Sequence, residues 1–508
     1  MKNRFSKYSL VIALAVSVSF SSCDKGFKEL NTSVDFVSEP TLEFLLPYVQ
    51  LTMVDKNYYT QTYYAAAYAS QINTNVSFPS ITAYKSTEMS EHWVWSYKNP
   101  LKNIVDFIER CEGDPSKVNY LSIGRILKVY LFHSLTDSYG DIPYSEAIKG
   151  YSEGITTPKY DTQQEIYADM FKELTEAIAA FNTAKGTPLS ADIVYNGDIA
   201  KWKKFANSLM LRLALRIVKV DPVNSKKYAE QAIAGGLMIS NADNFVVNYT
   251  TQIAGTGTTS NGTAHTWVSS SYITTYRLTQ PFVDSLRMRN DPRTPVYAMK
   301  VKLPLTSYQE GEHNPAIQKG RDQFVQSVPR DTASVANIRT FGRYAAPFIH
   351  LSYAQVQFQL AELVVRNMIT SATTAKTYYE NGVKAAMTEL TIYGSDGWNA
   401  STGITTAQQD AYLLANPYDP ANALKQINTQ YWIETFPNYY EAWANMRRSG
   451  FPDTYSGLNL TLSGNLGAQL PRRLYYPRDE YAANPNINAA VTRQGADLTS
   501  TRVWWDKP

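Results

Sequence analysis

The chain has little of the residue types that build disulfide frameworks and metal sites. Among its 508 residues it has two cysteines, Cys23 and Cys111. Two cysteines cannot form the several bridges that hold a small secreted domain together, so stability must come from a large core, which a chain this long can bury. The five histidines are too dispersed to predict a zinc site and form no HxxH or HExxH motif: His92, His133, His265, His313 and His350.

Motifs of nucleophilic and phosphate chemistry are also missing. The sequence has no GxSxG motif, no Walker loop and no Rossmann glycine pattern. The glycine-rich run at 255–262 has no lysine after it and no predicted strand before it, so it does not predict a phosphate site. His133 and Asp137 lie one helical turn apart in an apolar stripe, where we expect a core pair. No catalytic residue and no cofactor is predicted.

A surplus of positive charge is absent as well. The chain has 48 basic and 45 acidic residues, but residues 1–22 contain three of the basic ones and no acidic one. Without that segment the two signs balance, and no run of lysine or arginine occurs. Because nucleic-acid binding depends on a basic surface, nucleic acid is not an expected partner.

The apolar run near the N-terminus is too short to be a permanent membrane span. It covers 8–20 and follows Lys2, Arg4 and Lys7, whereas a spanning helix needs roughly 20 apolar residues. This pattern predicts a cleaved export signal at 1–22. The sequence SFSSC then resembles a lipobox, which predicts acylation of Cys23 and a lipid-anchored mature chain of 23–508 forming a single domain. The alternative is an ordinary secretory signal with an unrelated cysteine.

Aromatic residues are abundant. The 37 tyrosines, 9 tryptophans and 19 phenylalanines make 13% of the chain. Tyrosine and tryptophan combine an apolar face with a polar group, so this excess suits either a broad packed core or the stacking of flat, hydroxyl-rich ligands. The overall composition, with 44% hydrophobic and 18% charged residues, is typical of a globular protein.

Helical periodicity accounts for most of the sequence. Apolar residues recur at three- and four-residue spacing in these stretches: 42–70, 93–108, 121–139, 162–181, 199–217, 228–233, 352–367, 374–394, 419–436 and 439–450. Pro222 is expected to end the helix before it, and the tail beyond 450 is expected to be extended. The polar spans 240–277 and 301–346 have no helical period and predict long insertions. The predicted fold is therefore mostly α, with adjacent helix pairs of about tetratricopeptide length but no clean repeat.

The segment at 136–147, TDSYGDIPYSEA, terminates the predicted helix 121–139 with Gly140 and Pro143. A helix running into this segment resembles the SusD/RagB-like family of surface lipoproteins. Further blocks in family order extend the resemblance over nearly the whole mature chain, among them KELNT, NDPR, SYAQVQFQLAEL, EAWANMRRSGFP, LPRRLYYPRDE and VWWD.

The resemblance implies a scaffold of four tetratricopeptide-like helix pairs that supports an irregular, loop-built face. It implies an outer-membrane lipoprotein at the cell exterior that binds a nutrient and delivers it to a SusC-like TonB-dependent transporter. The expected cargo is an oligosaccharide, with a peptide or another non-glycan nutrient as the alternative. The protein would bind its cargo without a covalent step.

Two other classes of function stay open at this level. An all-α glycoside hydrolase would need two carboxylates facing each other across a cleft, and no pair among the 45 acidic residues stands out. An intracellular helical-repeat adaptor would bind only protein, and the predicted export signal argues against it.

Aromatic residues in irregular spans are the candidate ligand contacts, because those in helical stripes are expected to be core. The candidates are Phe78, Tyr84, Trp267, Tyr272 and Trp398. Another set is expected to have structural roles, through indole packing and through pairing of guanidinium groups with carboxylates or carbonyls: Trp443, Arg447, Arg448, Trp504 and Trp505.

Overall fold

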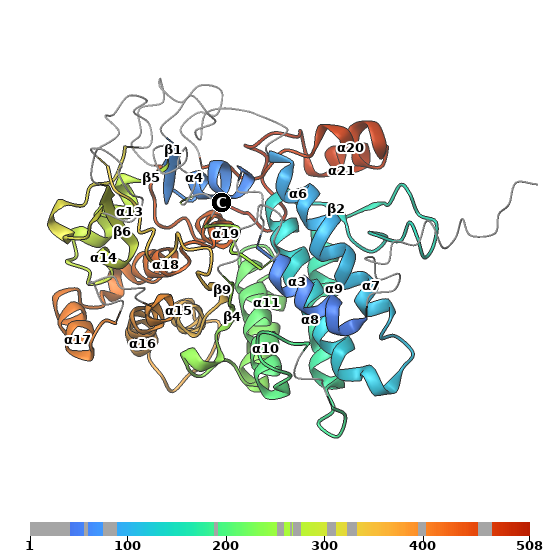
Figure 1. Cartoon of the computed structure of the whole chain (residues 1–508), viewed down its shortest axis with the longest axis horizontal. Coiled ribbons are helices and arrows are strands. Elements are labelled where there is room, and N and C mark those ends of the chain that lie inside the picture. Colours follow the sequence, from blue (N-terminus) through green and yellow to red (C-terminus); the bar gives the residue numbers. More distant parts are fainter. Residues whose placement is uncertain are drawn as a thin grey trace, which may run out of the picture.

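The computed structural model describes most of the chain (Figure 1). The described residues are 41–54, 59–74, 89–186, 191–250, 259–264, 267, 276–301, 311–322, 333–394, 403–455 and 470–508. The predicted signal segment and Cys23 lie outside them, as do Phe78, Tyr84, Tyr272 and Trp398.

Helices dominate the described structure, so the mostly-α prediction is confirmed. The N-terminal half contains α3 (Leu42–Thr52), the π-helical turns η1 (Tyr59–Ala65) and η2 (Tyr97–Leu101), α4 (Ala66–Tyr68), α6 (Glu91–Ser96), α7 (Lys102–Glu109), the turn η3 (Pro115–Lys117), α8 (Val118–Tyr139), α9 (Gln163–Ala180), α10 (Ile199–Arg216) and α11 (Pro222–Gly235). Neighbouring helices pack in pairs, α7 and α9 against α8, and α10 against α11 (Figure 1). This pairing is the tetratricopeptide-like arrangement that the sequence predicts.

The C-terminal half contains the second group of helices. They are α13 (Gln280–Arg287), α14 (Thr294–Tyr297), α15 (Tyr353–Val365), α16 (Ala375–Glu389), α17 (Thr406–Ala415), α18 (Ala423–Glu434), α19 (Tyr439–Ser449), α20 (Arg478–Ala483) and α21 (Ile487–Gln494), with short 3-10 turns η4 (Asn241–Asp243), η5 (Pro315–Ile317), η6 (Leu390–Tyr393) and η7 (Pro420–Asn422). Here α15 packs against both α16 and α18, and α18 packs against α19.

Small antiparallel sheets connect the helices. The pairs are β1 (Ile72–Thr74) with β5 (Tyr276–Leu278), β2 (Ile142–Pro143) with β3 (Tyr160–Asp161), and β4 (Phe245–Val247) with β9 (Phe348–Leu351). A three-stranded sheet has the order β7 (Gly311–Glu312), β6 (Ala298–Val301), β8 (Val335–Ala336). The strands β4 to β9 lie within or beside the predicted insertions 240–277 and 301–346, whereas β1, β2 and β3 lie elsewhere in the chain.

One prediction about element boundaries is incomplete and another is wrong. The helix before Pro222 does end, at Arg216, but Pro222 also occupies the first turn of α11, where the Asp221 carboxylate accepts a hydrogen bond from the backbone N–H of Asn224. A first-turn proline loses no hydrogen bond, because its missing N–H would have no partner inside the helix. The tail is not fully extended, since it contains α20 and α21. Only two residues of these short helices are buried, Ile487 and Ala490, which is too few to produce a recognisable apolar period.

The core absorbs much of the aromatic excess. Phe205 stacks on Phe245 with ring centroids 4.1 Å apart, and Trp93 contacts Tyr139 edge to face at 5.1 Å. Fully buried tyrosines such as Tyr64, Tyr68 and Tyr139 extend the same core. Among the described helices, none is long and apolar enough to cross a bilayer.

Candidate functional site

The 136–147 segment is a buried junction between α8 and the C-terminal tail. Gly140 ends α8 with φ +86°, and its carbonyl accepts a hydrogen bond from the Thr136 hydroxyl at 2.6 Å. The Gln494 amide spans the corner, donating to the Tyr139 carbonyl at 3.1 Å and accepting from the Asp141 N–H at 2.8 Å. This segment therefore has a structural role: it fixes the tail to the helical scaffold.

Asp137 organises a buried charged network next to that corner. One carboxylate oxygen accepts hydrogen bonds from the Tyr167 hydroxyl at 2.5 Å and the Trp505 indole at 2.7 Å, and the other lies 3.1 Å from the Arg216 guanidinium. Arg216 also pairs with Glu441 at 2.5 Å. Every charge in this group has a partner, as stable burial requires.

The residues with predicted structural roles take those roles. The Arg447 guanidinium lies 3.8 Å from the Trp443 ring and 4.8 Å from the Trp505 ring. Arg448 makes two hydrogen bonds to Glu362, at 2.6 and 2.8 Å. Burial raises the pKa of Glu362, but this arginine and Arg366 outweigh it and lower that pKa to about 2. Trp504 is only half-buried and packs 5.9 Å from the ring of Tyr167.

One predicted ligand contact, Trp267, lies within the described residues. Its side chain is fully buried and meets Tyr276 edge to face, with ring centroids 5.9 Å apart. The ring therefore packs in the interior of this structure, and its contact with a ligand stays a prediction. The other four predicted contacts, Phe78, Tyr84, Tyr272 and Trp398, lie outside the described part of the chain.

The chain ends that lead into several insertions meet at one place, which we call the anchor face. Thr74, the last residue before 75–88, pairs in register with Tyr276, the first after 268–275. The N–H of Leu278 donates to the carbonyl of Ser334, which closely follows 323–332. The Tyr455 hydroxyl, just before 456–469, donates to the Tyr68 carbonyl at 2.9 Å. Figure 1 shows β1, β5 and α4 together on this side of the molecule.

The anchor face brings together chain ends that are far apart in sequence. Phe78 and Tyr84 belong to 75–88, and Tyr272 belongs to 268–275, so three of the five predicted contacts are on segments that start or end there. Trp398 follows Tyr393, whose ring packs 4.4 Å from Phe341 in a separate aromatic cluster. The sequence alone could not show this grouping, because it depends on strand pairing.

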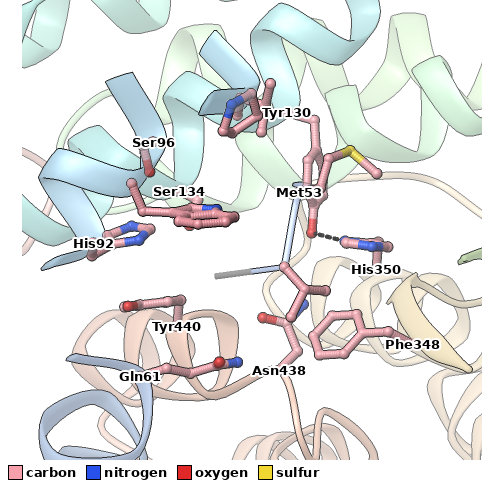
Figure 2. A pocket seen from close by; sticks show the side chains of 14 residues that line it. Met53, Gln61, His92, Ser96, Tyr130, Ser134, Phe348, His350, Asn438 and Tyr440 are labelled. Carbon is pink, nitrogen blue, oxygen red and sulfur yellow. Dashed lines mark hydrogen bonds between the residues drawn. The ribbon is translucent and has the colours of Figure 1, made fainter. Parts of the chain in front are cut away.

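A pocket lies beside the elements that carry the anchor face (Figure 2). We call it the aromatic pocket, and its lining residues are Met53, Val54, Gln61, His92, Trp95, Ser96, Pro100, Tyr130, Leu131, Ser134, Phe348, His350, Asn438 and Tyr440. Gln61 lies on η1, which continues into α4 and β1, and Tyr440 lies on α19, which packs against η1 and α4. The cavity volume is about 40 Å³.

Buried polar atoms in this pocket lack partners within the described chain. The Tyr130 hydroxyl and Nδ1 of His350 are 2.8 Å apart, which leaves His350 Nε2 without a hydrogen bond. Oε1 of Gln61 also makes none, although Gln61 is 2% exposed. The ring of His92, which is 6% exposed, has the Ser134 carbonyl as its nearest partner, at a geometry short of a full hydrogen bond. The ring of His92 stacks on Tyr440 at 4.0 Å. Burial lowers the pKa of both His92 and His350 to about 3, so both are neutral at physiological pH.

A smaller cavity of about 10 Å³ adjoins the aromatic pocket and shares Tyr130, Ser134, Asn438 and Tyr440 with it. Its carboxylates, Asp137 and Glu441, are engaged by Arg216, and the space is sufficient for about one water molecule. This arrangement cannot place a glycosidic bond between two carboxyl groups. Across the described ranges, no group of three or more histidine, cysteine, aspartate or glutamate side chains is arranged to hold a metal ion.

The sequence did not predict the aromatic pocket. The apolar stripe of 93–108 identifies the buried face of α6 through Trp93, whereas His92, Trp95 and Ser96 line the pocket from the rest of the same helix. A helix with aromatic and polar residues on more than one face is the signal that could have indicated a second buried surface. The partners of α6, which come from 53–61, 348–350 and 438–440, could only be seen in three dimensions.

Comparisons with known proteins find similar sequences and structures over most of the chain. The SusD-like family model, described as starch-binding and associating with the outer membrane, matches residues 35–477. A solved chitin-binding protein is 31% identical, and the match covers 92% of this chain and 100% of that protein with a TM-score of 0.80. A SusD-like protein from Bacteroidetes AC2a is 27% identical, covered to 92% and 100%, with a TM-score of 0.81. A SusD homologue from Bacteroides uniformis is 26% identical, covered to 92% and 99%, with a TM-score of 0.76. Among functionally curated proteins, none is significantly similar to this chain.

Proposed function

The chain belongs to the SusD-like family, and on that premise we propose that it is a cell-surface lipoprotein that binds an oligosaccharide and delivers it to a SusC-like TonB-dependent transporter. The observation that carries this proposal is the similarity over almost the full chain to a family described as starch-binding and to a relative described as chitin-binding. The described structure supports it with a helical scaffold that gathers the ends of several insertions at the anchor face.

The cargo we propose to test first is a β-linked oligosaccharide of the chitin type, because the relative at 31% identity binds chitin. Binding would combine the stacking of sugar faces on aromatic rings with hydrogen bonds from amide and hydroxyl groups. Phe78, Tyr84, Tyr272 and Trp398 remain our proposed contacts. Trp267 would support the anchor face from inside, since it packs on Tyr276 of β5.

A binding assay with product analysis tests this function. The purified chain without 1–22 would be titrated with a panel of glycans and peptides, and each mixture would be analysed for cleavage products. We expect one glycan class to bind and to be recovered intact. Tyr84→Ala should weaken binding by about tenfold, because one stacked ring contributes roughly 1 kcal/mol or more.

The matched control is Tyr151→Ala. Tyr151 is fully exposed in the turn that follows β2, so its loss should leave binding unchanged. Peptide binding without glycan binding would replace the oligosaccharide with a peptide cargo. Turnover that is lost on changing a single carboxylate would favour a hydrolase instead.

Membrane attachment is a separate part of the proposal. We expect Cys23 to be acylated after cleavage at 22, so Cys23→Ala should move the protein from the membrane fraction to the soluble fraction of the producing cells. Cys111 is buried and cannot substitute as the anchor site. Membrane partitioning that does not change in the variant would refute the lipoprotein assignment and leave the glycan-binding test unaffected.

A further inference from the structure

The aromatic pocket combines buried polar atoms that lack hydrogen bonds with open space beside them. Its deepest polar groups are more than nine-tenths buried, at 6% exposure for His92, 2% for Gln61 and 1% for His350, and they have atoms without hydrogen bonds. Leaving such groups unpaired costs roughly 1–3 kcal/mol each, so natural structures pair them with water or with a ligand. An occupant of the pocket, whether water or a ligand group, would therefore both donate and accept hydrogen bonds.

The size of the pocket limits what that occupant can be. A cavity volume of about 40 Å³ is sufficient for roughly three water molecules. A sugar ring, with about a dozen non-hydrogen atoms, cannot enter, but a substituent with three or four such atoms can. Met53, Trp95, Ser134 and Tyr440 are partly exposed, which indicates that the pocket reaches the surface and can receive a group from outside.

The hydrogen-bonding and apolar groups that line the pocket further limit which chemical group can occupy it. Gln61 Oε1 can only accept a hydrogen bond, whereas a neutral His92 ring has one donor and one acceptor nitrogen. The rings of Trp95, Phe348 and Tyr440 present apolar surface to the same space. Figure 2 shows His92 on one side of the pocket and His350 on the other, with Tyr440 and Gln61 below His92 in this view. An occupant that matches these walls has an N–H donor, a carbonyl acceptor and a methyl group.

We propose that the aromatic pocket receives the acetamido group of an N-acetylated sugar in the bound oligosaccharide. Its N–H would donate to Gln61 Oε1, its carbonyl would accept from Nε2–H of His350, whose Nδ1 is paired with the Tyr130 hydroxyl, and its methyl would pack on the aromatic walls. The proposal rests on the proposed glycan-binding function and adds the chemical feature by which this chain selects its cargo. A protonated amine in place of the acetamido group would be rejected, since no carboxylate lines this pocket.

Titration calorimetry with three pentasaccharides of the same linkage tests the proposal. The probes are the fully N-acetylated chitin pentamer, the cellulose pentamer, which has a hydroxyl in place of each acetamido group, and the deacetylated chitosan pentamer. The acetylated pentamer should bind at least tenfold more tightly than either of the others. Gln61→Met keeps the volume and removes the acceptor, so it should weaken that binding by about tenfold.

A second variant, Ser134→Leu, replaces a hydroxyl oxygen by three carbon atoms at a partly exposed wall position of α8 and should abolish the preference for the acetylated pentamer. The matched control is Ser285→Leu, at a partly exposed serine within α13 that does not line the pocket, and it should change nothing. Thermal melting of each variant verifies folding. If Ser134→Leu does not fold, Gln61→Met decides the test.

The possible results separate this inference from the function on which it rests. If the three pentamers bind equally well, or if neither pocket variant alters the preference, glycan binding stands and the pocket assignment is overturned. A crystal structure of the acetylated complex with only ordered water in the aromatic pocket also overturns it. If no glycan on the panel binds, the proposed function itself fails, and the pocket assignment fails with it.

Discussion

A buried pair of carboxyl groups makes the stability of this protein depend on pH in a direction that can be tested. Glu389 at the end of α16 and Glu434 at the end of α18 are 3% and 5% exposed. Ser352 and Gln355 donate to one oxygen of Glu434, and Asn244 donates to Glu389 at 3.3 Å. Burial raises the pKa of Glu434 to about 7, and burial together with the neighbouring carboxyl raises that of Glu389.

The expected sign follows from proton binding. Below the ordinary pKa of 4.5, Glu434 is protonated in both the folded and the unfolded chain. Between about pH 4.5 and about pH 7 only the folded chain keeps the proton, so the free energy of unfolding falls by about 1.4 kcal/mol per pH unit as the pH rises. Above about pH 7 both states are ionised and the loss is complete. The largest loss is therefore about 3 kcal/mol.

Glu434→Gln removes this loss, because the amide keeps an oxygen for Ser352 and Gln355 but cannot ionise. We expect the variant to match the parent protein near pH 4.5 and to be more stable by up to about 3 kcal/mol at pH 8. Urea unfolding followed by circular dichroism at several pH values measures this difference through the midpoint. The comparison between the two proteins cancels the contributions of His92 and His350, which titrate in both.

The control substitution should act in the opposite direction. Glu362→Gln breaks the pairs with Arg448 and Arg366, so it should destabilise the protein by roughly 3–5 kcal/mol at pH 7. Since the folded pKa of Glu362 is about 2, that penalty should shrink as the pH falls below 4.5. A Glu434→Gln variant that is equally destabilised at every pH would refute the claim that this carboxyl is held protonated.

Two further predictions concern the junction between α8 and the tail. Trp505→Ala should lower the free energy of unfolding by roughly 3–5 kcal/mol, because it empties a fully buried site and removes the indole donor to Asp137. Trp504 is half-buried, so Trp504→Ala should lower the free energy of unfolding by clearly less in the same urea assay. Asp137→Ala should lower the free energy of unfolding by roughly 3–5 kcal/mol, because it leaves the buried Arg216 with one fewer partner. Asp106→Ala removes an exposed ion pair with Arg110 and should lower the free energy of unfolding by no more than about 1 kcal/mol. Equal costs for the two aspartates would contradict the role of burial in this network.

The sequence predicts the long helices well because their signals are local. α8 has a full apolar stripe and an explicit stop at Gly140, and α9 begins with a capping box between Thr162 and Glu165. The sequence does not predict α17, although Thr405 caps this helix in the same way. Only Gln409 and Tyr412 of α17 are buried, so the helix has no recognisable apolar stripe. Short helices that contribute few side chains to the core are identified by their packing partners, which the sequence does not reveal.

The candidate site was less predictable, since it depends on contacts between distant segments. Choosing aromatic residues from irregular spans places Trp267 among the candidates, yet its ring is buried against Tyr276. The same rule excluded Trp95 and Tyr440 because both lie in predicted helices, and both line the aromatic pocket. Membership in a helix is therefore a poor criterion for a core role when a helix has neighbours on several sides.

The two buried polar systems near α8 differ in a way that separates support from binding. Around Asp137, one carboxylate oxygen accepts hydrogen bonds from Tyr167 and Trp505, and the other forms an ion pair with Arg216 without a well-formed hydrogen bond. One or two turns away, on the side of Tyr130 and Ser134, buried histidine and glutamine atoms are left without hydrogen bonds and the space between them is open. Both systems therefore contain buried polar atoms without a hydrogen bond, but around Asp137 opposite charges compensate each other, whereas the pocket atoms face open space. That contrast is the physical reason to look for a ligand group at the aromatic pocket and only for stability at the Asp137 network.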